Sequence, residues 1–91
     1  MRRGRYDIGN DWARYAFDEY ETWGGNVIRV EIETATLTDT RGGYTYPHGA
    51  RRVTVKMRGG GKRTKTFIGE LAWADAKRWA DDIVWDLRRS N

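Results

Sequence analysis

RRVTVKMRGGGKRTKTFI, residues 51–68, is the stretch that decides the fold. From Val53 to Met57 apolar residues alternate with polar ones, and this period of two is typical of a strand with one buried face. The three glycines at positions 59–61 permit a tight reversal of the chain. Lys62–Ile68 is rich in threonine, ends in two apolar residues and returns beside the first strand. We therefore predict a β-hairpin with one apolar face and one basic face.

This hairpin is the most basic part of the chain, with seven Lys or Arg residues and no acidic residue. The net charge of +4 divides into −1 for residues 1–26, +6 for residues 27–69 and −1 for residues 70–91. A basic segment between two mildly acidic ones is typical of a patch that binds anions. We expect the hairpin to contact nucleic-acid phosphates through eight residues: Arg51, Arg52, Thr54, Lys56, Arg58, Lys62, Arg63 and Lys65.

The segment before residue 24 has the spacing of an amphipathic helix. Asn10 or Asp11 can cap a helix that runs to about Trp23, where Gly24 and Gly25 end it. One side of this helix gathers aromatic and apolar residues at spacings of three and four: Trp12, Tyr15, Ala16, Tyr20 and Trp23. We therefore predict an N-terminal helix.

Asn26–Asp39 alternates over its whole length and predicts the longest strand. Its apolar face begins at Ile28, and its other face carries Arg29, Glu31 and Glu33. The two glutamates project the same way, as a catalytic carboxylate pair would. We favour the alternative that they pair across strands with a basic neighbour on the hairpin: Arg52, Lys56 or Lys65.

Two further segments offer auxiliary contacts. Residues 1–9 predict a flexible basic arm, which is either a frayed terminus or a contacting arm. Thr40–Ala50 is turn-rich: Tyr44–Tyr46 predicts a short strand, and residues 47–49 predict a turn. This loop either has a function or covers a sheet edge. The candidate auxiliary residues are Arg2, Arg3, Arg5, Arg41, Tyr44 and Tyr46.

From about Glu70 to Arg89 the period changes to 3.6 and predicts a helix. Its apolar stripe consists of Ala72, Ala76, Trp79, Ala80, Ile83 and Leu87. At about 100° per residue, Trp85 points away from this stripe. It lies between Arg78 and Arg89, either as the anchor of a protein interface or flat under neighbouring side chains.

These elements predict one α+β domain over residues 1–91. It has an N-terminal helix, three or four antiparallel strands, and a C-terminal helix packed on one sheet face. Between Phe67 and Ile68 only one can point inward, and we choose Phe67. The other predicted core residues are Ile28, Val30, Ile32, Val53, Val55, Met57, Trp79, Ile83 and Leu87.

The side chains available exclude most enzyme chemistry. The chain has no cysteine, one serine (Ser90) and one histidine (His48), which we expect to be solvated in a loop. Gly59–Arg63 lacks the Ser or Thr and the following helix of a phosphate-binding loop. We therefore expect no enzyme activity, cofactor or metal. With no apolar run of membrane-spanning length and no signal peptide, we expect a cytoplasmic protein.

Two families resemble parts of the sequence. RRVTVKMR, GKRTKTF and ADAKRWADDI are similar to the arm-binding N-terminal domain of tyrosine-recombinase integrases, in which a three-stranded sheet packs on a C-terminal helix. That resemblance implies that Arg52, Thr54, Lys56, Arg58 and Lys65 face DNA. The order helix, strands, helix also resembles the double-stranded RNA-binding domain, with Asp75-Ala76-Lys77 and Ala80 at the start of its last helix.

The expected function is that of a small DNA-binding accessory protein of phage or mobile-element type. Its basic hairpin would hold the backbone of duplex DNA, with no enzymatic step. The alternative is a protein-interaction module or an anti-defence inhibitor. It would bind an acidic protein surface through the basic face, or a partner or second copy through Arg78, Trp85 and Arg89.

Overall fold

Two long antiparallel strands form the centre of a sheet in the computed structural model, which describes residues 5–90. The elements in chain order are β1 (Tyr6–Ile8), β2 (Ala13–Glu21), β3 (Val27–Asp39), β4 (Thr45–Met57), β5 (Lys62–Ile68) and α1 (Ala72–Ser90). β3 pairs with β4 from Ile28 opposite Met57 to Thr38 opposite Thr45. β5 pairs with the outer side of β4, while β2 and β1 follow one another along the outer side of β3.

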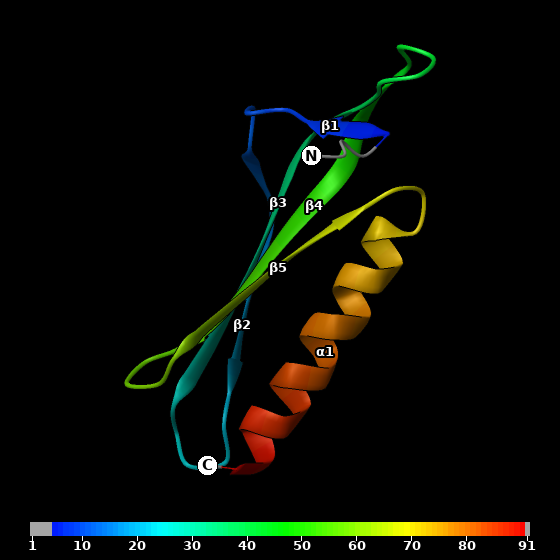
Figure 1. Cartoon of the computed structure of the whole chain (residues 1–91). Coiled ribbons are helices and arrows are strands. Elements are labelled where there is room, and N and C mark those ends of the chain that lie inside the picture. The colour runs from blue at the N-terminus through cyan, green and yellow to red at the C-terminus, as the bar shows by residue number, and fades with distance from the viewer. Residues whose placement is uncertain (1–4, 91) are drawn as a thin grey trace.

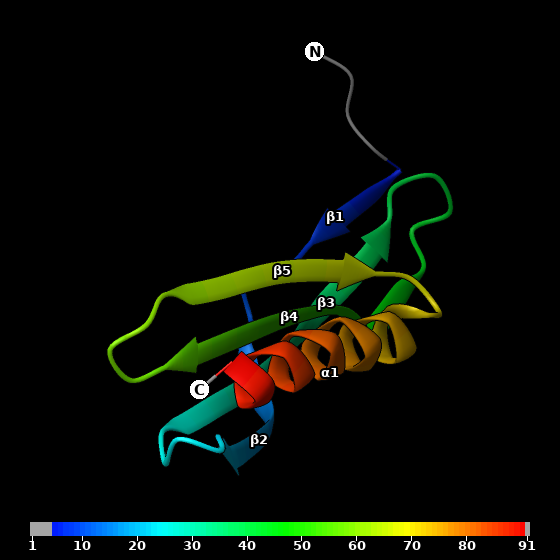
Figure 2. The same cartoon turned by 90° about the horizontal axis from the view of Figure 1, so that it is seen from below.

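The sheet twists strongly, and α1 lies across one of its faces (Figures 1 and 2). The predicted C-terminal helix is thus confirmed, as is its apolar stripe. Ala72, Ala76 and Ala80 are buried, and such small side chains allow the helix to lie close to the strands. The chain is α+β, with a helix layer on an antiparallel sheet.

The predicted core is also confirmed. Ile28, Val30 and Ile32 of β3 are buried with Val53 and Val55 of β4 beneath the helix. Met57, Phe67, Trp79 and Leu87 pack against them and are partly buried, and Ile83 is buried. Phe67 is the inward residue of its pair, with its ring centroid 6.1 Å from that of Trp79, whereas Ile68 is 46% exposed.

The predicted N-terminal helix is wrong, because residues 13–21 form strand β2 against β3. Residues four apart share a face in a strand as well as in a helix, so Ala16 and Tyr20 fit both periods. Aromatic residues favour strands, and β3 supplies the hydrogen-bonding partner. A bulge between Arg14 and Ala16 shifts the alternation at Tyr15 and hides the period of two.

The glycines expected to end that helix instead belong to the turn between β2 and β3. Gly25 has φ of 90°, and its amide donates to the Thr22 carbonyl. The buried Thr22 hydroxyl accepts the Asn26 amide at 2.9 Å. The turn therefore closes a β-hairpin rather than a helix end.

Two further expectations differ from the structure near the other end of the sheet. Tyr6–Ile8, placed by the sequence in a flexible arm, pairs with Leu37–Asp39 as β1. Residues 47–49, expected to form a turn, continue β4 as an irregular stretch where the pairing jumps from Tyr46 to Ala50. Gly49 is needed there, because a Cβ at this position would lie 2.6 Å from Leu37 Cβ. Arg2 and Arg3 lie outside the described residues.

Candidate nucleic-acid interface

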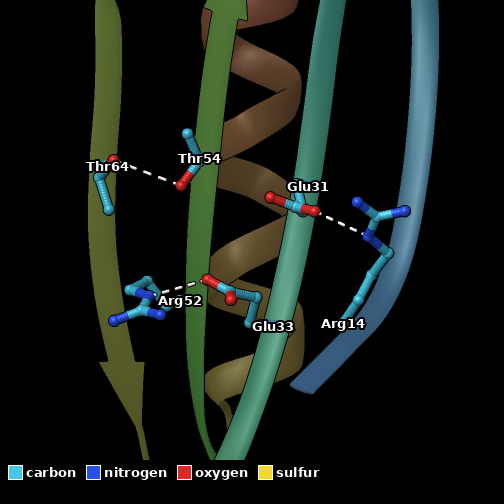
Figure 3. Close-up of polar contacts among 6 residues, drawn as sticks. All are labelled: Arg14, Glu31, Glu33, Arg52, Thr54 and Thr64. Atoms are coloured by element: carbon cyan, nitrogen blue, oxygen red, sulfur yellow. Dashed lines mark hydrogen bonds and ion pairs between the residues drawn. The ribbon is translucent and has the colours of Figure 1, made fainter. Parts of the chain in front are cut away.

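The sheet has a helix face and an open face, and strand alternation assigns each basic residue to one of them. On β4, Val53, Val55 and Met57 point to α1, so Arg52, Thr54 and Lys56 project from the open face. Figure 3 shows Arg52 and Thr54 on this face, with the helix behind the strands. Cross-strand register then adds Lys62, Thr64 and Thr66 of β5 to the open face.

The expectation that Lys65 shares a face with Arg52 is wrong. Lys56 lies opposite Lys62, and Val53 lies opposite Lys65, so Lys65 projects on the helix side. Its Nζ is 5.4 Å from the centroid of the Phe67 ring. Lys62 and Lys65 are an odd number of residues apart, so a strand must place them on opposite faces. Arg63, opposite Val55, also projects on the helix side.

Arg51 likewise belongs to the helix face and not to the predicted surface. Its guanidinium carbon lies 4.5 Å from the ring centroid of Tyr15 and 4.7 Å from that of Trp73. The residue therefore ties the β2 bulge to the start of α1 by cation–π contacts. His48, expected in a solvated loop, lies in β4 beside this group, with Nδ1 3.2 Å from the Thr34 hydroxyl.

Three arginines of the open face are neutralised by carboxylates. Arg52 Nε donates to Glu33 at 2.9 Å, Arg14 Nε to Glu31 at 2.7 Å (Figure 3), and Arg29 Nε to Glu19 at 2.8 Å. Cross-strand pairing of the two β3 glutamates is thus confirmed. The partner of Glu31, however, is Arg14 on β2, which the sequence interpretation had placed in a helix. Because of these three ion pairs, the centre of the open face carries little net charge.

A group of five cations without a carboxylate partner among residues 5–90 lies at the end of the β4–β5 hairpin. We call its five members the hairpin cluster: Lys56, Arg58, Lys62, Arg63 and Lys65. Within the part of the chain that the structure describes, none of the five forms an ion pair. Lys56 and Lys62 lie directly opposite each other on the open face. Like charges in that position destabilise a strand pair, so the cluster is better suited to holding an anion than to stabilising the fold.

Two adjoining hollows lie on the open face beside this cluster. The first, of about 390 Å³, lies between the β2–β3 turn and the end of β4 and is lined by Arg29, Lys56 and Arg58 among others. The second, of about 330 Å³, shares Arg29 and Lys56 with the first and adds Phe17. Sequence reasoning did not select Arg29 or Phe17. The alternation of Arg29 with the core residues of its strand is visible in the sequence and places Arg29 on the open face. Phe17 can be placed on that face only when β2 is recognised as a strand.

The four predicted auxiliary residues that the structure describes lie at the opposite end of the sheet. Arg41 and Tyr44 are in the β3–β4 turn and Tyr46 is near the start of β4, while the hairpin cluster is at the β4–β5 turn (Figure 1). The rings of Tyr44 and Tyr46 meet edge to face at 4.7 Å, and burial raises the pKa of Tyr46. Arg5 is also at this end, 5.7 Å from the Tyr6 ring. The structure therefore does not bring these residues together with the cluster.

Trp85 lies on the outer side of α1, as its helical phase predicted, and is 58% exposed. The guanidinium carbon of Arg89 is 5.4 Å from its ring centroid, and Arg89 also donates to Asp86 at 3.3 Å. Arg78 is exposed on the same helix. This tryptophan belongs to the layer opposite the open face, so the two surfaces are separate.

Comparison of the chain with protein-family models, with curated proteins and with solved structures finds no match in any of the three. Among residues 5–90, no group of three His, Asp or Glu side chains is placed to hold a metal ion. No helix in the described part of the chain is long and apolar enough to cross a membrane.

Proposed function

We propose that this protein is a non-enzymatic nucleic-acid-binding protein, with DNA as its foremost ligand, that contacts phosphates through the hairpin cluster. The observation that supports it best is the placement of Lys56 opposite Lys62 without a carboxylate to separate them. Elsewhere on the open face, each of three arginines (Arg14, Arg29 and Arg52) forms an ion pair with a glutamate. Phosphates neutralise such uncompensated cations, and the release of their counter-ions contributes to affinity.

The shape of the hairpin supports the same proposal. The β4–β5 turn projects away from α1 at one end of the sheet (Figures 1 and 2). A projecting two-stranded ribbon is a form that proteins use to approach the grooves and backbone of nucleic acids. Cations project from both faces of β5, so the tip is basic on both sides. We therefore place the main phosphate contacts at the hairpin tip.

A charge-reversal pair tests this proposal. We expect Lys56→Glu with Lys62→Glu to weaken binding by at least about tenfold at low salt, because two phosphate contacts are lost and repulsion replaces them. The slope of log affinity against log salt should become shallower by roughly 0.7 to 0.9 for each lost contact. Fluorescence anisotropy with labelled single strands and duplexes measures both quantities.

Arg78→Glu with Arg89→Glu is the matched control, since it makes the same change of net charge on the helix layer. It should leave nucleic-acid affinity within about twofold, apart from a small long-range effect that salt screens. Equal losses in the two double variants would show that only net charge matters. The absence of binding to any DNA or RNA by the unaltered protein at low salt would contradict the proposal.

The second candidate function is protein binding through α1, and it rests on the exposure of Trp85. A large exposed aromatic side chain beside an arginine, as Trp85 is beside Arg89, is typical of interface anchors. The partner would be another protein or a second copy of this chain, in the manner of a phage-encoded inhibitor of host defence. In either function we place the protein in the cytoplasm.

A further inference from the structure

The two hollows on the open face differ in their chemistry, although they share Arg29 and Lys56. The first is lined by three cations and by the β2–β3 turn, and no carboxylate is among its lining residues. The second is lined by the ion pairs of Arg14 with Glu31 and of Arg29 with Glu19, and by Lys56 and the ring of Phe17. The first hollow therefore attracts an anion more strongly than the second, in which carboxylates offset two of the three cations.

The first hollow has the cations that a phosphate group needs. Lys56 and Arg58 form no ion pair within the described residues. Arg29 is held through Nε by Glu19 at 2.8 Å, which fixes the plane of its guanidinium. A guanidinium has five N–H donors, so the single bond to Glu19 leaves most of them for a ligand. The site combines a positioned arginine with two unpaired cations.

The second hollow has the groups that a nucleobase needs. Phe17 is 44% exposed, and an exposed phenyl ring offers a stacking surface for the face of a base. The Arg14 guanidinium carbon lies 5.1 Å from the centroid of this ring, and Arg14 Nε binds Glu31 at 2.7 Å. Glu31 and Glu19 offset the charges of Arg14 and Arg29, and carboxylate oxygens accept hydrogen bonds from base N–H groups, so this hollow suits a base edge better than a phosphate.

We infer that the open face binds single-stranded nucleic acid, with one phosphate in the first hollow and the adjoining base against Phe17 in the second. This inference rests on the proposed function and specifies its ligand. In a duplex the bases stack on one another, so their faces are not free to contact a phenyl ring. The sequence alone predicts duplex DNA, because a basic two-stranded ribbon fits a major groove, and it assigns Phe17 to a helix.

The decisive variant is Phe17→Leu, which removes the aromatic face but keeps an apolar side chain of similar size. We expect it to weaken binding of a labelled ten-nucleotide single strand by about tenfold, the range found for loss of one stacked base. Phe17→Tyr should restore most of that affinity. Trp85→Leu is the matched control: Trp85 is 58% exposed on α1, in the layer opposite the open face. It should bind as the unaltered protein does.

Competition and titration complete the test. A hairpin duplex of the same sequence should compete at least about tenfold less well than the single strand, because its bases stay stacked. Inorganic phosphate should shift the amide resonances of residues 25–29 and 56–58 in a saturable way, more than those of residues 63–66. Circular dichroism verifies that each variant is folded.

The outcomes separate this inference from the proposed function. If Phe17→Leu binds the single strand normally while the reversal of Lys56 and Lys62 abolishes binding, the base site is refuted and the hairpin proposal stands. Equal or tighter duplex binding would also overturn the single-strand assignment. If no nucleic acid binds at all, both fail. Phosphate shifts spread evenly over every surface cation would overturn the first hollow.

Discussion

Asp11 is a clear case of one side chain holding two segments together. Its carboxylate accepts the Thr36 hydroxyl at 2.6 Å and the Thr36 amide at 3.0 Å, and so fastens the segment between β1 and β2 to β3. These hydrogen bonds stabilise the ionised form, and they lower the pKa of Asp11 below its usual value. Asp11 is exposed, so water screens its interactions and this contact is one of several that hold the edge.

The lowered pKa leads to a prediction about acid stability. A carboxylate with a depressed folded-state pKa contributes stability that is complete above its unfolded pKa of about 3.9 and is lost as the pH falls through the folded value. We expect Asp11→Asn to lower the urea midpoint at pH 7. The difference from the unaltered protein should shrink below about pH 4.

Urea unfolding followed by tryptophan fluorescence at several pH values measures this difference. Asp81→Asn is the matched control, because Asp81 is exposed on α1 and far from the β1–β2 segment. It should change the midpoint little. A difference for Asp11→Asn that stays constant from pH 7 to pH 3 would show that the charge of Asp11 is not what matters.

At the scale of elements, the helix–sheet spacing depends on small side chains. Ala76 is fully buried between α1 and the sheet. We expect Ala76→Leu to destabilise the protein by about 1–3 kcal/mol, because the longer side chain must push the helix from the strands. Ala74→Leu makes the same substitution at an exposed position of α1 and should change stability by less than about 0.5 kcal/mol.

Chemical denaturation of both variants checks this prediction. The difference between the two variants measures the effect of burial, because the substitution and its change in helix propensity are the same at both positions. Similar losses in both would show that the effect comes from the helix itself and not from its contact with the sheet.

The elements also show which parts of the fold were predictable. The β4–β5 hairpin and α1 could be predicted because their periods are unambiguous over many residues. β2 could not, because the spacing of Ala16 and Tyr20 suits both periods and the bulge at Tyr15 interrupts the alternation. β2 pairs with β3, and a pattern read along one short segment of the sequence does not reveal such a pairing between two segments.

The candidate site was predicted in composition but not in arrangement. All the residues of the hairpin cluster were identified, since charge density is visible in the sequence. Their distribution over two faces depends on the register across the glycine turn, which sets Lys56 opposite Lys62. The neutralisation of Arg14 and Arg29 by glutamates needed β2 to be placed beside β3. Arg51 illustrates the same point, because its aromatic neighbours come from β2 and α1.

For the whole molecule, the question is whether the helix layer has a partner of its own. An exposed tryptophan that anchors an interface typically contributes more than about 2 kcal/mol to binding, whereas its truncation changes folding stability by less than about 0.5 kcal/mol. We therefore expect Trp85→Ala to leave the melting temperature nearly unchanged. If α1 forms a dimer, the variant should be monomeric where the unaltered protein is not.

Sedimentation velocity over a range of concentrations, together with a thermal melt, tests this expectation. Trp23→Ala is a suitable control, because Trp23 is also exposed but lies in the β2–β3 turn. A large loss of thermal stability in Trp85→Ala would contradict its surface position. An unchanged oligomeric state would remove the support for a second copy as the partner.

The position of β5 at the edge of the sheet affects whether copies of the chain can associate edge to edge. β5 is the last strand of the sheet, so its outer backbone groups have no strand partner within residues 5–90. Such an edge invites strand addition and aggregation, and lysine side chains are a common protection against it. Two copies joined along β5 would bring the cations of both strands, Lys62, Arg63 and Lys65 of each, to one seam. The cations that we assign to ligand binding thus also keep this edge free, and a bound polyanion that neutralises them would remove that protection.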